Sequence, residues 1–91
     1  MEEKYKVKND PNVIEILYDA NLKKNPPISS TDFEIKNIRL VLKDSRVIPS
    51  NGPASGDSIA FNLDGNLKFV KVSFWDLMRK SKLYKSFNLN F

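Results

Sequence analysis

The predicted fold depends on residues 58–85, SIAFNLDGNLKFVKVSFWDLMRKSKLYK. Two alternating apolar runs, 59–63 and 67–72, flank the loop 64–66, and Asp-Gly between such runs is the strongest short-range signal of a β-hairpin. Ser73 and Asp76 then fit a capping box, in which each side chain bonds the backbone N–H of the other residue. The sequence therefore predicts a hairpin that runs directly into a helix over 74–86.

The register of this hairpin has two alternatives. A three-residue loop, 63–65, would place Phe61 opposite Leu67, whereas a two-residue loop, 65–66, would place Phe61 opposite Val70. Both registers gather apolar side chains on one face, so the sequence does not choose between them. The choice matters because a shift of one residue moves the lysines to the other face.

Upstream of the hairpin, residues 11–24 are predicted to form a helix. Asp10 suits an N-cap, and Pro11 suits the first helical position, where its missing N–H is not needed. Apolar residues recur at helical spacing, at Ile14, Leu17, Tyr18 and Leu22. The prolines of 25–27 are expected to end the helix.

Residues 32–42 pose a choice between helix and strand. Thr31 and Glu34 fit a second capping box, but the apolar residues would lie on every side of a helix. A strand with a bulge near Asn37 accommodates their shift in phase, and a strand is the favoured interpretation. The identity of residues 31–36 stays open between the two.

Three shorter segments complete the predicted organisation. Residues 5–8 alternate as a short first strand would, and residues 47–48 are expected to extend a strand before a Pro/Gly-rich loop within 44–57. Residues 87–91 alternate as an edge strand would, pairing either within the sheet or with another chain. The predicted fold class is α+β, a single domain over 1–91. Its antiparallel sheet of three or four strands has two helices on one face, in the order (β)-α-β-loop-β-β-α-(β).

Composition excludes several classes of function. The 91 residues include neither Cys nor His, so disulfides, thiolate or imidazole metal ligands and Cys or His catalysis are absent. We expect a non-enzymatic protein with no cofactor and no metal site. The charged N-terminus and the lack of a long apolar run predict a cytoplasmic protein without a signal peptide or membrane span.

Charge is unevenly distributed along the chain. Residues 1–64 carry nine Lys or Arg against ten Asp or Glu, whereas residues 65–91 carry six cations against Asp76 alone. A local basic field attracts phosphates or acidic protein surfaces. The predicted partner-binding residues are Lys68, Lys71, Trp75, Arg79, Lys80, Lys82 and Lys85, with the loop 49–57 expected to lie outside the binding surface.

Three functions are compatible with this pattern. The favoured one is a small regulator or inhibitor, of the kind that phages and mobile elements encode, which binds an acidic protein surface or a protein–nucleic-acid complex. The alternative is a DNA- or RNA-binding protein, in which the lysines neutralise phosphates and aromatic side chains stack on bases. In length, basicity and its β-rich half, the chain also resembles small ribosome-dependent ribonuclease toxins of the RelE type. That resemblance implies RNA cleavage, but the catalytic residues of those toxins match no positions here.

Overall fold

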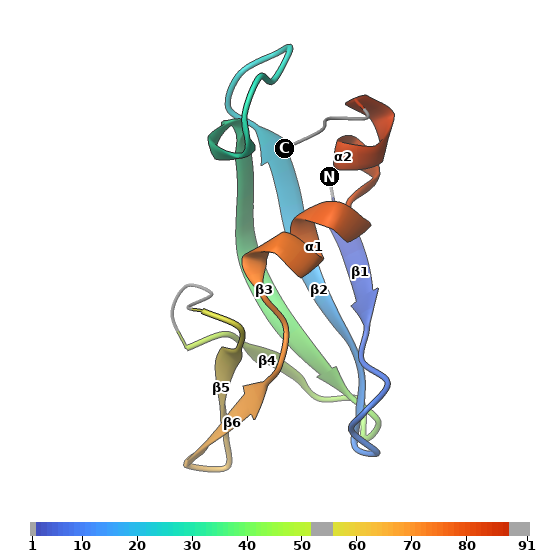
Figure 1. The fold of residues 1–91 in the computed structure, drawn as a ribbon. Coiled ribbons are helices and arrows are strands. Elements are labelled where there is room, and N and C mark those ends of the chain that lie inside the picture. The colour runs from blue at the N-terminus through green and yellow to red at the C-terminus, as the bar shows by residue number, and fades with distance from the viewer. Residues whose placement is uncertain (1, 52–55, 88–91) are drawn as a thin grey trace.

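The computed structural model describes residues 2–51 and 56–87. Its four-stranded antiparallel sheet has the order β1-β2-β3-β4, and β5 and β6 form a separate hairpin. The strands are β1 Glu2–Lys6, β2 Val13–Leu22, β3 Phe33–Leu42, β4 Val47–Pro49, β5 Ile59–Leu63 and β6 Asn66–Val70. A 3-10 turn, η1 Ser30–Asp32, precedes β3, and two short helices, α1 Phe74–Lys80 and α2 Lys82–Phe87, end the described chain (Figure 1).

The predicted α+β class is confirmed in part, but the predicted order of elements is wrong. The helix expected over 11–24 is the strand β2, so both helices follow the strands. Asp10 caps no helix. Its carboxylate accepts a hydrogen bond from the Asn12 N–H (2.9 Å), and its carbonyl accepts one from the Val13 N–H (3.3 Å). Asp10 and Pro11 therefore belong to the turn that joins β1 to β2. The expected first strand, 5–8, is present as β1 over earlier residues.

The strand predicted over 32–42 is confirmed as β3, which begins at Phe33, and so is its bulge. Between the pairs Leu17↔Arg39 and Asp19↔Lys36, β3 has one residue more than β2. Asn37 lies in this bulge with a φ of 55°, a conformation that Asn tolerates better than most residues. The bulge restores the phase of β3, so that apolar residues before and after it face the same core.

A single 3-10 turn, not a capped α-helix, precedes β3. The Asp32 carboxylate accepts hydrogen bonds from the backbone N–H groups of Ile28 (2.7 Å) and Ser29 (3.0 Å). These bonds hold the pKa of Asp32 below its usual value, with the Ile28 N–H as the largest cause. The helical alternative for residues 31–36 is therefore limited to the turn that ends at Asp32.

The predicted hairpin is confirmed, but both predicted registers are wrong. Phe61 lies opposite Lys68, and Ile59 lies opposite Val70. The two-residue turn is Asp64-Gly65, with φ angles of 53° and 85°. Such primed turns need positive φ at both central residues, and their twist matches that of the strands.

The hairpin continues the sheet beyond β4, whose strand was predicted at 47–48. Ser50 forms an isolated antiparallel bridge with Phe61, and the Asn51 N–H donates to the Ala60 carbonyl (2.8 Å). The six strands thus follow one another in chain order around a curved surface, with β1 and β6 as its two end strands (Figure 1).

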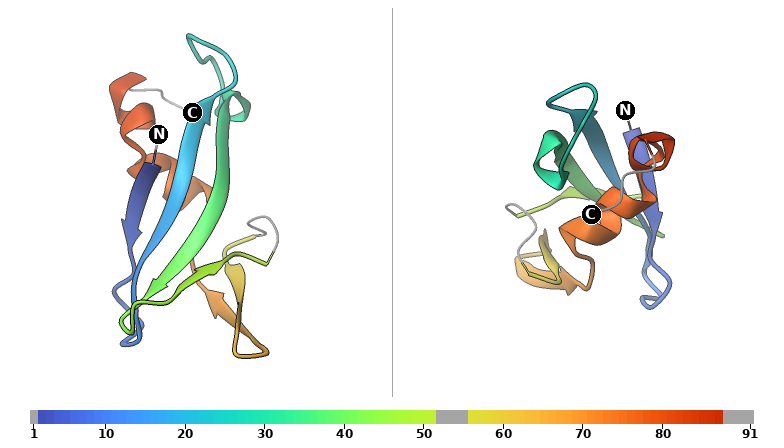
Figure 2. Two further views of the ribbon diagram at one scale, coloured as in Figure 1. Left: turned by 180° about the vertical axis from the view of Figure 1, so that it is seen from behind. Right: turned by 45° about the horizontal axis from the view of Figure 1, so that its top comes forward.

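The core lies between the sheet, the hairpin and α1. Figure 2 shows the hairpin and α1 on the same face of the long strands β2 and β3. Buried side chains on the inner faces include Ile16, Tyr18, Leu40, Ile59, Phe61 and Leu77. Among residues 2–51 and 56–87, no helix is long and apolar enough to cross a membrane.

The helix predicted over 74–86 is divided into two at Ser81. Its capping box is confirmed, because the Ser73 Oγ accepts from the Asp76 N–H (3.1 Å) and the Ser73 N–H donates to the Asp76 carboxylate (2.8 Å). Ser81 is extended, with φ −67° and ψ 137°. The strand predicted over 87–91 lies outside the described residues apart from Phe87, which ends α2.

A buried carboxylate explains this division. Glu3 is 4% exposed, and its Oε2 accepts hydrogen bonds from the Ser81 hydroxyl (3.2 Å) and the Lys82 N–H (3.1 Å). The Ser81 Oγ also accepts from the Leu83 N–H (3.1 Å). Together these two side chains satisfy the first N–H groups of α2, which would otherwise have no acceptor. They also fix β1 to the junction between the helices.

Candidate binding groove

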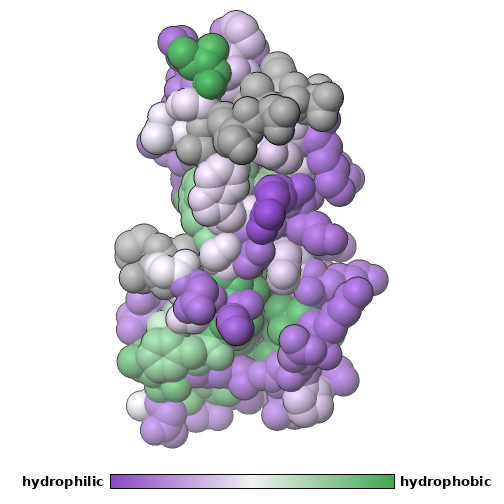
Figure 3. All heavy atoms as spheres, viewed as in Figure 1, coloured by the Kyte–Doolittle hydropathy of each residue, from purple (hydrophilic) through white to green (hydrophobic). Residues whose placement is uncertain are grey.

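A groove of about 690 Å³ separates the two end strands of the curved sheet. One side is formed by the consecutive residues 4–10, the other by the consecutive residues 69–72, and Lys80 of α1 completes the lining. Figure 3 shows a hollow below α1, where apolar atoms lie deeper than the hydrophilic side chains beside them. We call this feature the basic groove.

Strand alternation divides the lining of the basic groove into two rows. Tyr5 lies directly opposite the buried Ile16 and therefore faces the protein interior. The inner row comprises Tyr5, Val7, Val70 and Val72, of which the last two are buried. The outer row comprises Lys4, Lys6, Lys8, Phe69 and Lys71, all of them exposed. The groove thus presents amines and one phenyl ring at its rim and apolar groups at its floor.

An ion pair marks one end of the groove, and a second hollow marks the other. At one end Lys68 forms an ion pair with Asp10. This contact lowers the pKa of Asp10, with the Lys68 hydrogen bond as the largest cause. At the other end a smaller hollow of about 260 Å³ shares Tyr5 and Lys80 with the groove. Its further lining residues are Asp76, Arg79 and Lys85.

The two hollows hold the excess positive charge of the protein. Their lining has seven cations and two carboxylates, a net charge of +5, whereas the whole chain carries +4. The rest of the chain is therefore net −1. Both carboxylates already have partners: Asp10 pairs with Lys68, and Asp76 serves the helix cap and pairs with Arg79 (3.2 Å).

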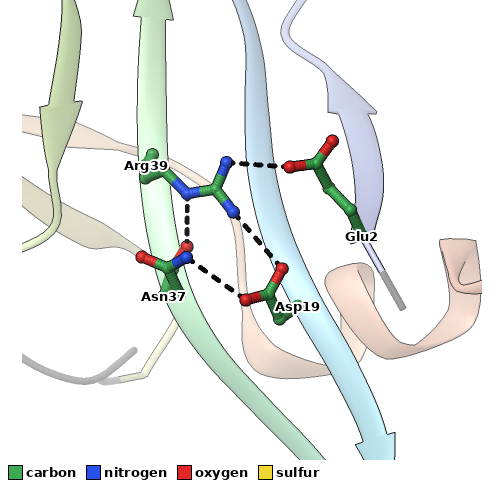
Figure 4. Close-up of polar contacts among 4 residues, drawn as sticks. All are labelled: Glu2, Asp19, Asn37 and Arg39. Carbon is green, nitrogen blue, oxygen red and sulfur yellow. Dashed lines mark hydrogen bonds and ion pairs between the residues drawn. The ribbon is translucent and has the colours of Figure 1, made fainter.

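A second group of charges lies on the outer face of the sheet, which Glu2 shares with Lys4 and Lys6 by strand alternation. Arg39 pairs with Glu2 (3.1 Å) and Asp19 (3.3 Å), and its Nε donates to the Asn37 carbonyl (3.0 Å). Figure 4 shows this cluster spanning β1, β2 and β3. Because its cation is matched by two carboxylates, the cluster joins strands and does not attract anions.

The structure separates the seven predicted binding residues. Lys71, Arg79, Lys80 and Lys85 line the two hollows, on the same side of the molecule. Lys68 is engaged by Asp10. Trp75 is 42% exposed on α1, but neither it nor the exposed Lys82 lines a hollow.

Three lysines of the groove were missed by the sequence analysis. Lys4, Lys6 and Lys8 come from a segment whose formal charges nearly cancel, so the charge count did not single them out. Their signal is a spacing of two residues, which places all three on one side of an extended chain.

The lining residues suit the binding of anions. Lysine amines and the Tyr5 phenol provide hydrogen-bond donors for carboxylate or phosphate oxygens. Among the described residues, no group of three or more His, Cys, Asp or Glu is placed to hold a metal ion.

Comparison of the chain with protein-family models, curated proteins and solved structures gives no match in any of the three.

Proposed function

We propose that this chain is a small non-enzymatic binding protein, of the regulator or inhibitor class, that holds an acidic segment of a partner protein in the basic groove. The observation that carries the proposal is the pairing of the two rows, with amines along the rim and apolar groups along the floor. Acidic side chains complement the rim, and apolar side chains of the same partner complement the floor.

A nucleic acid is the second candidate, and Phe69 is the observation that favours it. Its side chain is 65% exposed beside the lysines of the groove, as an aromatic platform for base stacking would be. The floor favours protein, because three of its four residues are the aliphatic Val7, Val70 and Val72. Bases bind to aromatic faces, whereas a recessed aliphatic floor suits aliphatic side chains.

The experiment compares two variants with the same change in charge. Lys71→Glu/Lys80→Glu reverses two exposed groove lysines, and Lys23→Glu/Lys24→Glu reverses two exposed lysines that do not line the groove. Each immobilised protein is incubated with lysate from the cells in which it occurs, with and without nuclease treatment. We expect the wild type and the control to retain one partner after nuclease treatment, and the groove variant to lose it.

Labelled DNA and RNA, added to each protein at low salt, test the second candidate. If phosphates are bound, log affinity should fall with log salt by about 0.9 per contact for duplex DNA and about 0.7 for single strands. Loss of every retained protein on nuclease treatment, with oligonucleotides shifted by the wild type, would contradict the first proposal. Cleavage of the labelled RNA would instead favour a ribonuclease.

A further inference from the structure

Two strand edges face the basic groove, and the polarity of their backbone groups follows from the pairing of each strand. The Val7 N–H donates to the Ile14 carbonyl (3.2 Å) in continuation of the β1–β2 ladder. In an antiparallel pair, alternate residues direct both N–H and C=O toward the partner strand. The backbone groups of Val7 and Tyr5 therefore point to β2, and those of Lys4 and Lys6 point away from it.

The same reasoning applies to β6. Leu63 and Asn66 flank a two-residue turn and form the first pair of the hairpin, which in such turns is hydrogen-bonded. Counting along the strand, Lys68 and Val70 direct their backbone groups to β5. Phe69 and Lys71 then direct theirs to the other side, where both residues line the groove.

We propose that the partner's acidic segment is extended and adds to the edge of β1 as a further strand within the basic groove. This inference rests on the function proposed above and specifies how the partner is held. Main-chain hydrogen bonds to Lys4 and Lys6 give the added strand its affinity, and side-chain rows on either side give it specificity.

The alternation of the groove defines the sequence of the occupant. Side chains of an added strand alternate between its two faces with a period of two residues. On one face they meet Tyr5 and Val7, and on the other face they meet Lys4 and Lys6. The occupant is therefore a segment of five or six residues in which apolar and acidic residues alternate. A block of acidic residues matches the rim but leaves the floor without apolar contacts.

The test uses synthetic peptides and the full chain. The first peptide alternates aspartate or glutamate with valine over six residues, and the second has the same composition in two blocks. We expect the alternating peptide to bind at least about tenfold more tightly, as measured by fluorescence anisotropy, and Lys71→Glu/Lys80→Glu to weaken it. A further peptide carries N-methyl groups on those alternate residues of the alternating peptide whose backbone N–H groups point to β1. It should bind about tenfold more weakly, because about two hydrogen bonds are lost.

Amide hydrogen exchange locates the contact within β1. On addition of the alternating peptide, exchange of the Lys4 and Lys6 amides should slow at least about tenfold. The Tyr5 amide, which already faces β2, should change little and is the internal control.

The outcomes separate this inference from the proposed function. Strand addition would be overturned if both peptides bound equally well and methylation had no effect. If that binding were also lost in the groove variant, acidic recognition would remain intact. No binding of the alternating peptide at millimolar concentration would overturn strand addition as well. If labelled oligonucleotides bound while both peptides failed, the proposed function would also be wrong.

Discussion

Replacing Tyr18 by Phe removes one hydroxyl group from the centre of the core. Tyr18 is fully buried, and its hydroxyl donates to the Leu77 carbonyl at 2.6 Å. That carbonyl is available because α1 ends here: the Ser81 N–H donates to the Met78 carbonyl (3.1 Å) instead. The bond therefore joins β2 to the last turn of α1, and the substitution removes it while keeping the aromatic ring.

The magnitude follows from what the substitution leaves behind. The ring is retained, so the loss of packing is small, but the buried Leu77 carbonyl loses its donor. An unsatisfied buried acceptor costs about 1–3 kcal/mol, so we expect a loss of about 2 kcal/mol in the free energy of unfolding. At about 4–8 °C per kcal/mol for a domain of this size, Tm should fall by roughly 8–16 °C.

The pH dependence of this loss provides a second, independent test. Burial raises the pKa of Tyr18 above its ordinary value, and the nearby charge of Glu3 acts in the same direction. The unfolded chain ionises near pH ~10, while the folded chain keeps its proton, so above this pH the folded state binds more protons. The stability due to Tyr18 is thus complete below pH ~10 and declines as the pH rises toward the folded-state pKa.

Urea unfolding of the wild type and Tyr18→Phe from pH 7 to pH 10.5 measures both effects. The difference between them should be largest at neutral pH and should shrink above pH ~10. Tyr5→Phe is the matched control, because Tyr5 lines the open groove and should lose little. Equal midpoints at pH 7, or a difference that stays constant to pH 10.5, would refute the role assigned to the hydroxyl.

Three further substitutions test local features of the fold. Ser73→Ala should cost about 1 kcal/mol, because the Asp76 N–H loses its acceptor; an unchanged urea midpoint would contradict the capping box. Gly65→Ala should cost about 1–2 kcal/mol at a φ of 85°, and Gly65→Asn should cost less, so equal losses would argue against a primed turn. Arg39→Lys should cost up to about 1 kcal/mol, and the loss should diminish in concentrated salt; a loss independent of salt would show that the paired carboxylates are not its cause.

Local sequence signals predicted the hairpin, the helix cap and the bulge in β3. Each depends on residues close together in the chain: Asp64-Gly65 for the turn, and Ser73 with Asp76 for the cap. The hairpin register was missed because apolar pairs are available in either alternative. The positive φ that both Asp64 and Gly65 adopt was the discriminating feature, since it selects these two residues as the loop.

The helix over 11–24 was predicted from Asp10-Pro11 and from the spacing of Ile14 and Tyr18, but Ile14 is 43% exposed while Tyr18 is buried. A bulge also places other apolar residues of β2 at a helical interval. The register of β2 shifts between Val13 and Glu15, so Val13 and Ile16, three residues apart, both face the core. Three residues is a helical interval. Beyond the shift, the buried residues Ile16, Tyr18 and Ala20 alternate as a strand requires, and pairing with β1 and β3 decides the outcome.

The basic groove was only half predictable, because its two sides are distant in the sequence. Lys71 and Lys80 belong to the basic third of the chain that the charge count singled out. Lys4, Lys6 and Lys8 alternate with apolar residues, and this indicated a strand but not its position. Only the order of the strands places β1 at the end of the curved sheet, across the groove from β6.

The contacts at the two ends of the groove explain why it is open and positively charged. Glu3 fixes one end of the N-terminal segment to Ser81, and Asp10 fixes the other end to Lys68. Between these two points, residues 4–8 are held beside β6 without being paired to it. A surface that is already ordered loses less entropy when a partner binds. Asp10, a carboxylate of the groove lining, is engaged by Lys68, so the exposed lysines of the lining leave the groove with a net positive charge for an acidic partner.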